Sequence, residues 1–261
     1  MKIEFAKYHG AGNDFIMTDC RKTDDSVFSE KLVKSLCNRN FGIGADGLIL
    51  LMNDENADFR MKYFNSDGKE GTMCGNGGRC ITAYAKKLGL VNKKAVFSGI
   101  DGLHEAVIKS PQTIDLKMID VHSVRKLSDG YLLNTGSTHF VLFCNNIDKL
   151  NVYEKGKEIR SQSRFGKEGT NVNFVEILDK GHMKIRTFER GVENETLACG
   201  TGAVASAISS YIHTNTDNTA YKVYVHGGTL EVRFEEKRDL SFENIWLSGP
   251  AEFVFEGIIQ I

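Results

Sequence analysis

Two cysteines occupy the same short pattern at distant points of the chain. The first pattern is Cys74-Gly-Asn-Gly-Gly, and the second is Cys199-Gly-Thr-Gly-Ala. A cysteine can exchange a proton near neutral pH when its surroundings lower the thiol pKa below the free value of about 8.5. Glycines after the thiol let a ligand come close to the backbone. The two patterns therefore predict a pair of thiols that act as acid and base.

Each cysteine stands just before a segment with the periodicity of a helix. Apolar side chains recur at helical spacing in residues 79–88 and 204–211, and Gly89 is a stop signal after the first segment. The first N–H groups of a helix lack intrahelical partners and carry partial positive charge, which lowers the pKa of a nearby thiol. The same groups bind a carboxylate. We expect two helix starts, each with one activatable thiol, around a single anion.

This arrangement suits the inversion of a carbon that bears a carboxylate and an amine. One thiolate removes a proton from one face of the carbon, and one thiol delivers a proton to the opposite face. The negative charge of the intermediate spreads into the carboxylate, where helix N–H groups stabilise it. The predicted ligand is a small molecule.

The two halves of the chain repeat one another. Cys74 and Cys199 are 125 positions apart, and Phe15 and Phe140 are separated by the same distance. Phe41-Gly in the first half matches Phe165-Gly in the second at a spacing of 124. Three matches in one order, at spacings of 125, 125 and 124, indicate an internal duplication. Two similar domains then face each other across a cleft, which is a preferred place for a ligand.

Short alternating segments dominate the rest of the chain. They are rich in β-branched and aromatic residues and predict strands at residues 2–5, 59–64, 113–118, 140–143, 183–188, 221–225, 230–234 and 253–255. A third helix is predicted at residues 29–38. The class is therefore α+β, with more strand than helix.

Composition excludes several classes of protein. The 261 residues are 41% hydrophobic and 26% charged, which is typical of a core-forming chain. The 33 basic and 34 acidic residues nearly cancel, so no excess of positive charge points to nucleic acid. No run approaches the roughly 18 apolar residues of a membrane span, and residues 1–10 do not resemble a signal peptide. We expect a cytoplasmic protein whose six cysteines are thiols.

The remaining cysteines are expected to be inert. Cys20, Cys37 and Cys144 are predicted to be small buried hydrophobes. Cys80 falls on the predicted helix, where it either packs or forms a redox pair with Cys74. The spacing of the histidines is not that of metal ligands, so no metal is predicted. The glycine patterns are neither GxxxxGK[ST] nor GxGxxG, which leaves little support for a nucleotide site.

At this point the chain resembles the diaminopimelate epimerase family over its full length. The residues that carry the resemblance are Lys7-Tyr-His-Gly-Ala-Gly-Asn-Asp-Phe15, Phe41-Gly-Ile-Gly-Ala-Asp46, Phe64-Asn-Ser-Asp-Gly68, Met73-Cys-Gly-Asn-Gly-Gly-Arg79, Gly169-Thr-Asn-Val-Asn-Phe174, Glu189-Arg-Gly191 and Ala198-Cys-Gly-Thr-Gly202. The resemblance implies cofactor-independent interconversion of LL- and meso-diaminopimelate on the route to lysine and peptidoglycan. It also implies a homodimer and two pseudo-symmetric lobes, each a strand-rich sheet around a central helix.

The resemblance also implies roles for single residues. Cys74 and Cys199 would be the acid and base. Backbone amides at the two helix starts would bind the carboxylate of the reacting centre; these belong to Gly75, Asn76, Gly200 and Thr201. Polar side chains would hold the substrate's amines and its distal carboxylate; these are Asn13, Asn65, Asn171 and Arg190. His139 and Glu189 would sit by the reacting amine and assist catalysis.

Simpler interpretations exist for some of these residues, and two positions depart from the family. Asparagine in a glycine-rich loop often only forms a turn, and Glu189 with Arg190 could be an exposed pair at a strand end. Many members have Gly-Asn-Pro-His where this chain has Gly136-Ser-Thr-His, which puts one substrate contact in doubt at Ser137. Some members have Gln at Gly47, so that side-chain contact is either missing here or supplied by water.

Three alternatives remain beside an epimerase of diaminopimelate. A proline racemase or hydroxyproline epimerase would have no use for the set of asparagines and Arg190. A thiol redox protein would depend equally on Cys74 and Cys80. A catalytically dead anion-binding module would not need both cysteines. The predicted lobes are residues 1–120 completed by 250–261, and residues 121–249, and we expect their closure to exclude water.

Overall fold

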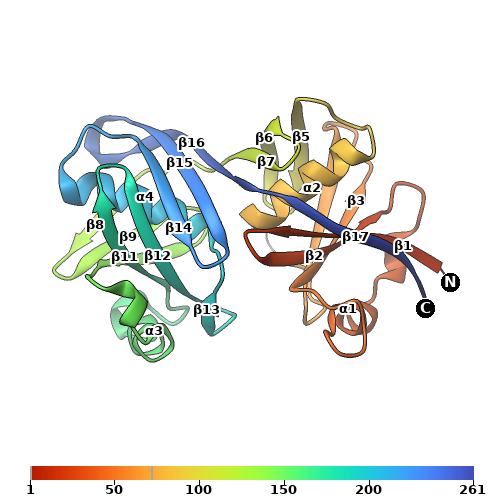
Figure 1. Ribbon diagram of the computed structural model, residues 1–261, viewed down its shortest axis with the longest axis horizontal. Coiled ribbons are helices and arrows are strands. Elements are labelled where there is room, and N and C mark those ends of the chain that lie inside the picture. Colours follow the sequence, from red (N-terminus) through yellow and green to blue (C-terminus); the bar gives the residue numbers. More distant parts are fainter. Residues whose placement is uncertain (1, 72) are drawn as a thin grey trace. The chain divides into compact units, whose positions relative to one another are not determined.

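The computed structural model describes residues 2–71 and 73–261 (Figure 1). The chain divides into two compact units. Unit 1 is Met1–Leu116 together with Gly249–Ile261, and unit 2 is Lys117–Ser248. Unit 1 therefore contains both ends of the described chain.

Unit 1 is built mainly of strands. Its elements are β1 (Lys2–Gly10), β2 (Asn13–Asp19), the 3-10 helix η1 (Asp25–Val27), α1 (Glu30–Cys37), β3 (Gly47–Met52), β4 (Phe59–Asn65), α2 (Gly75–Lys87), β5 (Lys94–Gly99), β6 (Gly102–Ser110), β7 (Thr113–Lys117) and β17 (Glu252–Gln260). The strands pair in the order β17-β1-β2-β3-β4-β5-β6-β7. The pairs β2–β3 and β4–β5 are parallel, and the others are antiparallel.

Unit 2 repeats this plan. Its elements are β8 (Val124–Leu127), β9 (Gly130–Asn134), β10 (Thr138–Phe143), η2 (Ile147–Lys149), α3 (Val152–Arg160), η3 (Ser163–Phe165), β11 (Asn171–Asp179), β12 (His182–Glu189), β13 (Asn194–Thr196), α4 (Gly200–Thr214), β14 (Ala220–Val225), β15 (Gly228–Glu236), η4 (Arg238–Leu240) and β16 (Phe242–Pro250). The strands pair in the order β8-β9-β10-β11-β12-β14-β15-β16, with β13 also on β12. The parallel pairs β10–β11 and β12–β14 match those of unit 1, which confirms the predicted internal repeat.

Each unit wraps its strands around one buried helix. The helix α2 packs against β1, β2, β3, β4 and β6, and α4 packs against the corresponding strands of unit 2. Glycine makes the approach of α2 close, because a Cβ on Gly77 would lie 2.9 Å from Ile49 Cδ1. In α4 small residues do the same: Ala203, Ala205, Ala207, Ser206 and Ser209 are all buried. The predicted α+β class, with a central helix in each half, is confirmed.

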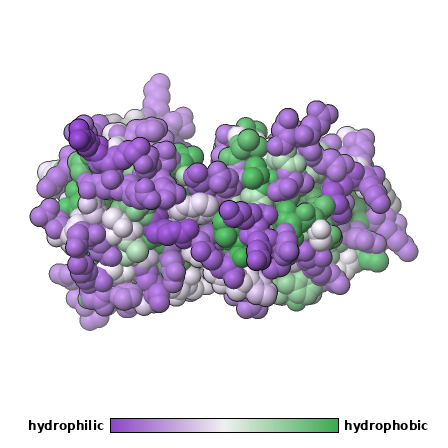
Figure 2. Space-filling view, turned by 90° about the horizontal axis from the view of Figure 1, so that it is seen from above, coloured by the Kyte–Doolittle hydropathy of each residue, from purple (hydrophilic) through white to green (hydrophobic). Residues whose placement is uncertain are grey.

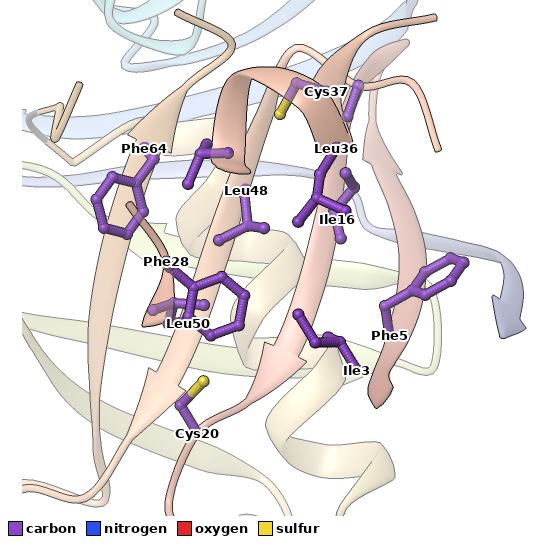
Figure 3. Close-up of a cluster of buried hydrophobic side chains, with 12 residues drawn as sticks. Ile3, Phe5, Ile16, Cys20, Phe28, Leu36, Cys37, Leu48, Leu50 and Phe64 are labelled. Atoms are coloured by element: carbon purple, nitrogen blue, oxygen red, sulfur yellow. The ribbon is translucent and has the colours of Figure 1, made fainter. Parts of the chain in front are cut away.

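The strands β2 and β3 are buried on both faces, and side-chain alternation separates the two faces. Phe15 and Ile49 point toward α2, since both lie near the Cβ position of Gly77. Ile16, Leu48 and Leu50 belong to a separate core beneath α1 (Figure 3). That core is completed by Ile3, Phe5, Cys20, Phe28, Val33, Leu36, Cys37, Ala45 and Phe64. The sheet of unit 1 is therefore a middle layer between α1 and α2.

The predicted helices exist, with corrected bounds. The helix α1 begins after Ser29, whose hydroxyl accepts a hydrogen bond from the Leu32 N–H, so the prediction for residues 29–38 is confirmed. The helices α2 and α4 begin four residues earlier than predicted, because the glycines after each cysteine are themselves helical. The helix α3 was not predicted. Gly156 lies at its centre, and glycine is a poor helix former.

Polar residues cover most of the surface in Figure 2, and hydrophobic residues come to the surface in places on unit 1. Those of β17 are Phe253, Val254, Phe255 and Ile258, which are 46%, 50%, 44% and 63% exposed. No helix within residues 2–71 and 73–261 is long and apolar enough to cross a membrane.

Gly156 is required by packing, and its replacement tests how α3 is held. A Cβ at this position would lie 2.3 Å from Phe188 Cβ, so Gly156→Ala forces the helix away from β12. We expect a loss of about 1–3 kcal/mol in the free energy of unfolding, although alanine is the better helix former. Urea unfolding measures the loss. The control Lys155→Ala is exposed on the same helix and should change stability by less than about 1 kcal/mol; equal effects would contradict the packing explanation.

Candidate active site

Each of the two predicted cysteines is the residue immediately before the central helix of its unit. Cys74 is the N-cap of α2 and Cys199 is the N-cap of α4, and both have extended backbones (φ −104°, ψ 128° and φ −122°, ψ 111°). Their carbonyl oxygens accept the first helical hydrogen bonds, from Gly78 N at 2.8 Å and from Ala203 N at 2.9 Å. Both side chains therefore stand at the positive end of a helix.

The other cysteines differ from these two. Burial raises the pKa of the thiols of Cys20, Cys37 and Cys80 to about 12, and it also raises the pKa of Cys144. They are protonated, and poor nucleophiles, at neutral pH. The structure contains all six cysteines as thiols rather than as disulfides. The burial of Cys80 weakens the interpretation in which it forms a redox pair with Cys74.

Asn13 connects the Cys74 thiol to the rest of unit 1. Its side-chain oxygen accepts hydrogen bonds from Cys74 Sγ at 3.7 Å and from Asn76 Nδ2 at 3.1 Å. Its Nδ2 donates to Asp46 Oδ2 at 2.7 Å. Because the carboxylate takes the amide's donor end, the oxygen end is fixed toward the thiol. The structure thus places two residues of the predicted site, Asn13 and Asn76, beside Cys74.

A cluster of charges holds Asp46 in turn. Arg39 Nη2 binds Asp14 Oδ1 at 2.8 Å and Asp46 Oδ1 at 2.7 Å, and Lys7 Nζ lies 2.8 Å from Asp14 Oδ2. Burial alone would raise the pKa of Asp14, but hydrogen bonds from Arg39 and Lys7 lower it to about 2. Sequence reasoning gave Asp46 no role, although it ends the Phe41–Asp46 motif. Only the fold shows that it orients Asn13.

The Cys199 thiol has a different neighbour. The hydroxyl Oγ1 of Thr201 lies 3.5 Å from Cys199 Sγ. The same hydroxyl is 2.9 Å from His139 Nε2, and Ser137 Oγ lies 2.9 Å from that nitrogen as well. His139 and Thr201 were both predicted, and the structure joins them to the thiol in one chain of hydrogen bonds.

Asn173 sets the tautomer of His139. Its Nδ2 donates to His139 Nδ1 at 2.9 Å and to the Phe140 carbonyl at 3.3 Å, while its Oδ1 accepts from Thr187 Oγ1 at 2.9 Å. Because His139 Nδ1 is an acceptor, the ring proton is on Nε2, and Nε2 donates to the hydroxyls. Burial and the positive charge of Arg190 lower the pKa of His139 to about 3, so the ring is neutral. Asn173 was quoted within a motif but given no role.

Asn171, Glu189 and Arg190 lie next to this chain of hydrogen bonds. Asn171 Oδ1 accepts from the Arg190 N–H at 2.9 Å, and its Nδ2 donates to Ser137 Oγ at 3.1 Å. Glu189 is the last residue of β12, directly before Arg190. Asn171 therefore belongs to the hydrogen-bonded group of Ser137, His139 and Thr201 beside Cys199, and the Arg190 N–H is bound to it.

Asn65 is the predicted substrate-binding residue whose position local structure alone can explain. It ends β4 and stands in a tight turn, with Asn65 N donating to the Lys69 carbonyl at 2.9 Å and Gly68 N donating to the Asn65 carbonyl at 2.9 Å. A turn-forming role is sufficient to explain this geometry.

The two departures from the family fit their surroundings. A Cβ at Gly47 would lie 2.5 Å from the Phe64 carbonyl oxygen, so this backbone has no room for a glutamine there. The hydroxyl of Ser137 belongs to the hydrogen-bonded group of His139 and Asn171. Among residues 2–71 and 73–261, no group of three or more His, Cys, Asp or Glu side chains could hold a metal ion.

Comparison with known sequences decides the family. The family model of diaminopimelate epimerase matches residues 5–118 and 131–254. The chain belongs to the diaminopimelate epimerase family. A diaminopimelate epimerase of Flavobacterium psychrophilum is 49% identical over 258 residues, which cover 98% of this chain and 100% of that one. One of Chlorobaculum tepidum is 43% identical, with 97% and 99% of the two chains covered.

Solved structures share the fold at low sequence identity. A phenazine biosynthesis protein of the PhzF family from Bacillus anthracis has a TM-score of 0.80 at 15% identity, with both chains covered in full (100%). A probable proline racemase from Agrobacterium radiobacter has a TM-score of 0.69 at 15% identity, and covers 99% of this chain and 92% of its own. These similarities show the fold alone.

His139 gives stability a specific pH dependence. In the unfolded chain its pKa is about 6.5, whereas in the folded protein it is about 3. Between these values only the unfolded state binds the proton, so His139 lowers stability as pH falls, by up to about 1.4 kcal/mol per pH unit. His139→Gln cannot titrate. Urea unfolding from pH 7.5 to pH 4.5 should show a shallower loss for this variant, and parallel curves for the two proteins would contradict a buried neutral histidine.

Proposed function

We propose that the chain catalyses the epimerisation of LL-diaminopimelate to meso-diaminopimelate in lysine and peptidoglycan precursor biosynthesis. The proposal rests on one observation that occurs in both halves of the chain: a cysteine is the N-cap of the central helix. Membership of the diaminopimelate epimerase family supports the choice of substrate.

The reaction needs one base and one acid. A thiolate removes the α-proton, the electron pair of the broken C–H bond passes toward the carboxylate, and a thiol on the other face protonates the carbon. The mechanism requires that both thiols act on the same α-carbon. In the reverse direction the two residues exchange their roles.

Hydrogen bonding supports a starting assignment of these roles. Thr201 Oγ1 accepts a hydrogen bond from the His139 Nε2–H group. The hydroxyl proton of Thr201 can then be donated to Cys199 Sγ, which lies 3.5 Å from Oγ1. A hydroxyl that donates to sulfur favours the thiolate, so Cys199 starts as the base. The acceptor Asn13 Oδ1 faces Cys74, and an acceptor favours the protonated thiol. Cys74 therefore starts as the acid.

The two helix starts would stabilise the charge that forms during the reaction. Backbone amides of Gly75 and Asn76, and of Gly200 and Thr201, would bind the carboxylate of the reacting centre. A helix terminus contributes at most about 2 kcal/mol and an oriented donor about 3–4 kcal/mol, whereas typical catalysis needs at least about 8 kcal/mol. Several donors must therefore act together, with water excluded.

The remaining predicted residues are proposed to select the substrate. Arg190 would bind the distal carboxylate through two hydrogen bonds, and Glu189 would sit by the reacting amine. Asn13, Asn65 and Asn171 would hold the amines. Because both ends of the Asn171 amide are engaged in the structure, its part in binding requires an exchange of partners.

Thiol catalysis constrains the setting of the protein. Oxidation of Cys74 or Cys199 would remove the thiolate that the reaction needs, so activity should depend on a reductant. A reducing compartment satisfies this need, and we propose the cytoplasm.

Solvent exchange tests the reaction. Purified protein, in D2O with reductant and chelator, should incorporate deuterium at the α-carbon of LL-diaminopimelate, and mass spectrometry measures the label. Cys74→Ala and Cys199→Ala should each lower turnover at least about 1000-fold, because each removes one partner of the proton transfer. Cys80→Ser is the matched control and should keep most of the activity, since Cys80 is buried.

The same assay separates the alternatives. Label in proline or hydroxyproline, without label in diaminopimelate, would overturn the substrate assignment. An equal loss in Cys80→Ser and Cys74→Ser would favour a thiol redox function instead.

We also propose that two copies of the chain associate through β17. This strand has β1 as its recorded partner, and it exposes Phe253, Val254, Phe255 and Ile258. Contact between an exposed apolar strand and water is unfavourable, so such a strand tends to associate with another chain. A twofold dimer, in which each β17 meets its counterpart, would cover part of this exposed apolar surface.

Charge on this strand should prevent association. The double variant Val254→Glu, Ile258→Glu brings two carboxylates of one copy close to the same two carboxylates of the other copy. Because like charges repel, we expect a monomer at micromolar concentration. Sedimentation velocity measures the mass. Leu178→Glu, at a 45% exposed position on β11, is the control and should leave the mass unchanged; a monomeric wild-type protein would refute the dimer.

A further inference from the structure

Arg79 is a fully buried cation in the helix that starts at Cys74. Its side chain is 0% exposed. The guanidinium donates to the Pro250 carbonyl at 3.3 Å, to the Gly75 carbonyl at 3.2 Å and to Asn76 Oδ1 at 2.8 Å. Within the part of the chain that the structure describes, the acceptors recorded for Arg79 are all neutral oxygens. A buried charge without an opposite charge is destabilising by several kcal/mol, so its presence calls for an explanation.

The acidic groups around Arg79 are two thiols. Burial lowers the pKa of Arg79, and Cys80 and Cys74 act on it in the opposite direction. The thiol of Cys80 has its pKa raised to about 12 and stays neutral. Cys74 is therefore the group that can become the counter-ion of Arg79, when its thiol gives up a proton.

Hydrogen bonds connect the guanidinium to the thiol. Arg79 donates to Asn76 Oδ1, and Asn76 Nδ2 donates to Asn13 Oδ1 at 3.1 Å. Cys74 Sγ contacts the same Asn13 oxygen at 3.7 Å. Arg79 Nη1 also binds the carbonyl of Gly75, the first residue of α2. The cation thus holds the turn of helix from which the thiol projects.

We propose that Arg79 is a positioning residue whose buried charge stabilises the thiolate form of Cys74. The inference rests on the proposed function, in which Cys74 becomes a thiolate each time it protonates the substrate. An acid works best when its pKa lies near the operating pH, and a positive charge in a low dielectric moves a thiol in that direction. Asn13 orients the S–H bond of Cys74, and Arg79 stabilises the thiolate that forms when the proton has been transferred.

Other charges near Cys74 are weaker or balanced. Glu252 of β17 is half-exposed and lies 3.8 Å from His9 of β1. Burial raises the pKa of Tyr8, also on β1, to about 12, so it is neutral. Behind Asn13, the cluster of Lys7, Arg39, Asp14 and Asp46 has two charges of each sign. Arg79 is thus the cation in this region without a carboxylate partner on record.

The pH dependence of alkylation tests the inference without any epimerase assay. In a Cys199→Ala background, iodoacetamide modification of Cys74 is followed by peptide mass spectrometry from pH 6 to pH 10. Arg79→Gln keeps hydrogen-bond donors but removes the charge, and it should slow modification at pH 7 at least about tenfold, equivalent to one unit of thiol pKa. Arg79→Lys keeps the charge and should restore most of the rate. Glu252→Gln is the control on the neighbouring strand and should change the rate less than twofold.

The outcomes separate charge from shape. Equal slowing in Arg79→Gln and Arg79→Lys would mean that hydrogen-bond geometry alone matters, and would overturn the inference, as would an unchanged profile in Arg79→Gln. Circular dichroism checks the fold of each variant, and Arg79→Met is the second neutral variant if Arg79→Gln does not fold. If the profile shifts as expected but wild-type protein exchanges no label into diaminopimelate, the thiol assignment stands and the substrate assignment fails.

Discussion

Both halves of the molecule depend on how closely a helix can approach the strands around it. In α2 the approach is close because Gly77 and Gly78 have no side chains, and in α4 because its inward residues are alanine and serine. A helix buried in this way has its N-terminus inside the protein, where its N–H groups act in a low dielectric. The cysteine before each helix is then held by backbone geometry rather than by a mobile loop. Larger residues would push the helix outward and move the thiol with it.

Alternation of apolar and polar residues predicted strands such as residues 183–188 and 230–234, in which one face packs on the core. Strands β2 and β3 were not predicted, for the opposite reason. They are buried between α1 and α2, so each has a continuous apolar run in place of alternation: Phe15 and Ile16 in β2, Leu48 and Ile49 in β3. Helix α3 escaped because Gly156 breaks its pattern, and only the contact with Phe188 explains that glycine. The early start of α2 and α4 was hidden by glycines that usually indicate turns.

The candidate site was predictable to the extent that single residue types carry the chemistry. Two thiols before two helices follow from the Cys-Gly-x-Gly repeat, and the internal repeat follows from its spacing. The partners that orient the predicted groups were not predictable, because Asp46 and Asn173 act through contacts between segments that are more than 30 residues apart in the sequence. Asp46 sets the direction of an amide and Asn173 the tautomer of an imidazole. Such roles depend on which end of a polar group meets which neighbour, and a linear sequence does not contain that information.

The position of β17 has a consequence for how the chain acquires its structure during synthesis. This strand is the last element in the sequence, yet it pairs with β1, the first, and Pro250 just before it accepts a hydrogen bond from Arg79. Unit 2 is continuous and can fold as soon as it leaves the ribosome. Unit 1 must wait with its sheet unfinished until β17 has been synthesised, and the edge of β1 stays unprotected until then. The half of the protein that is made first is therefore the half that matures last.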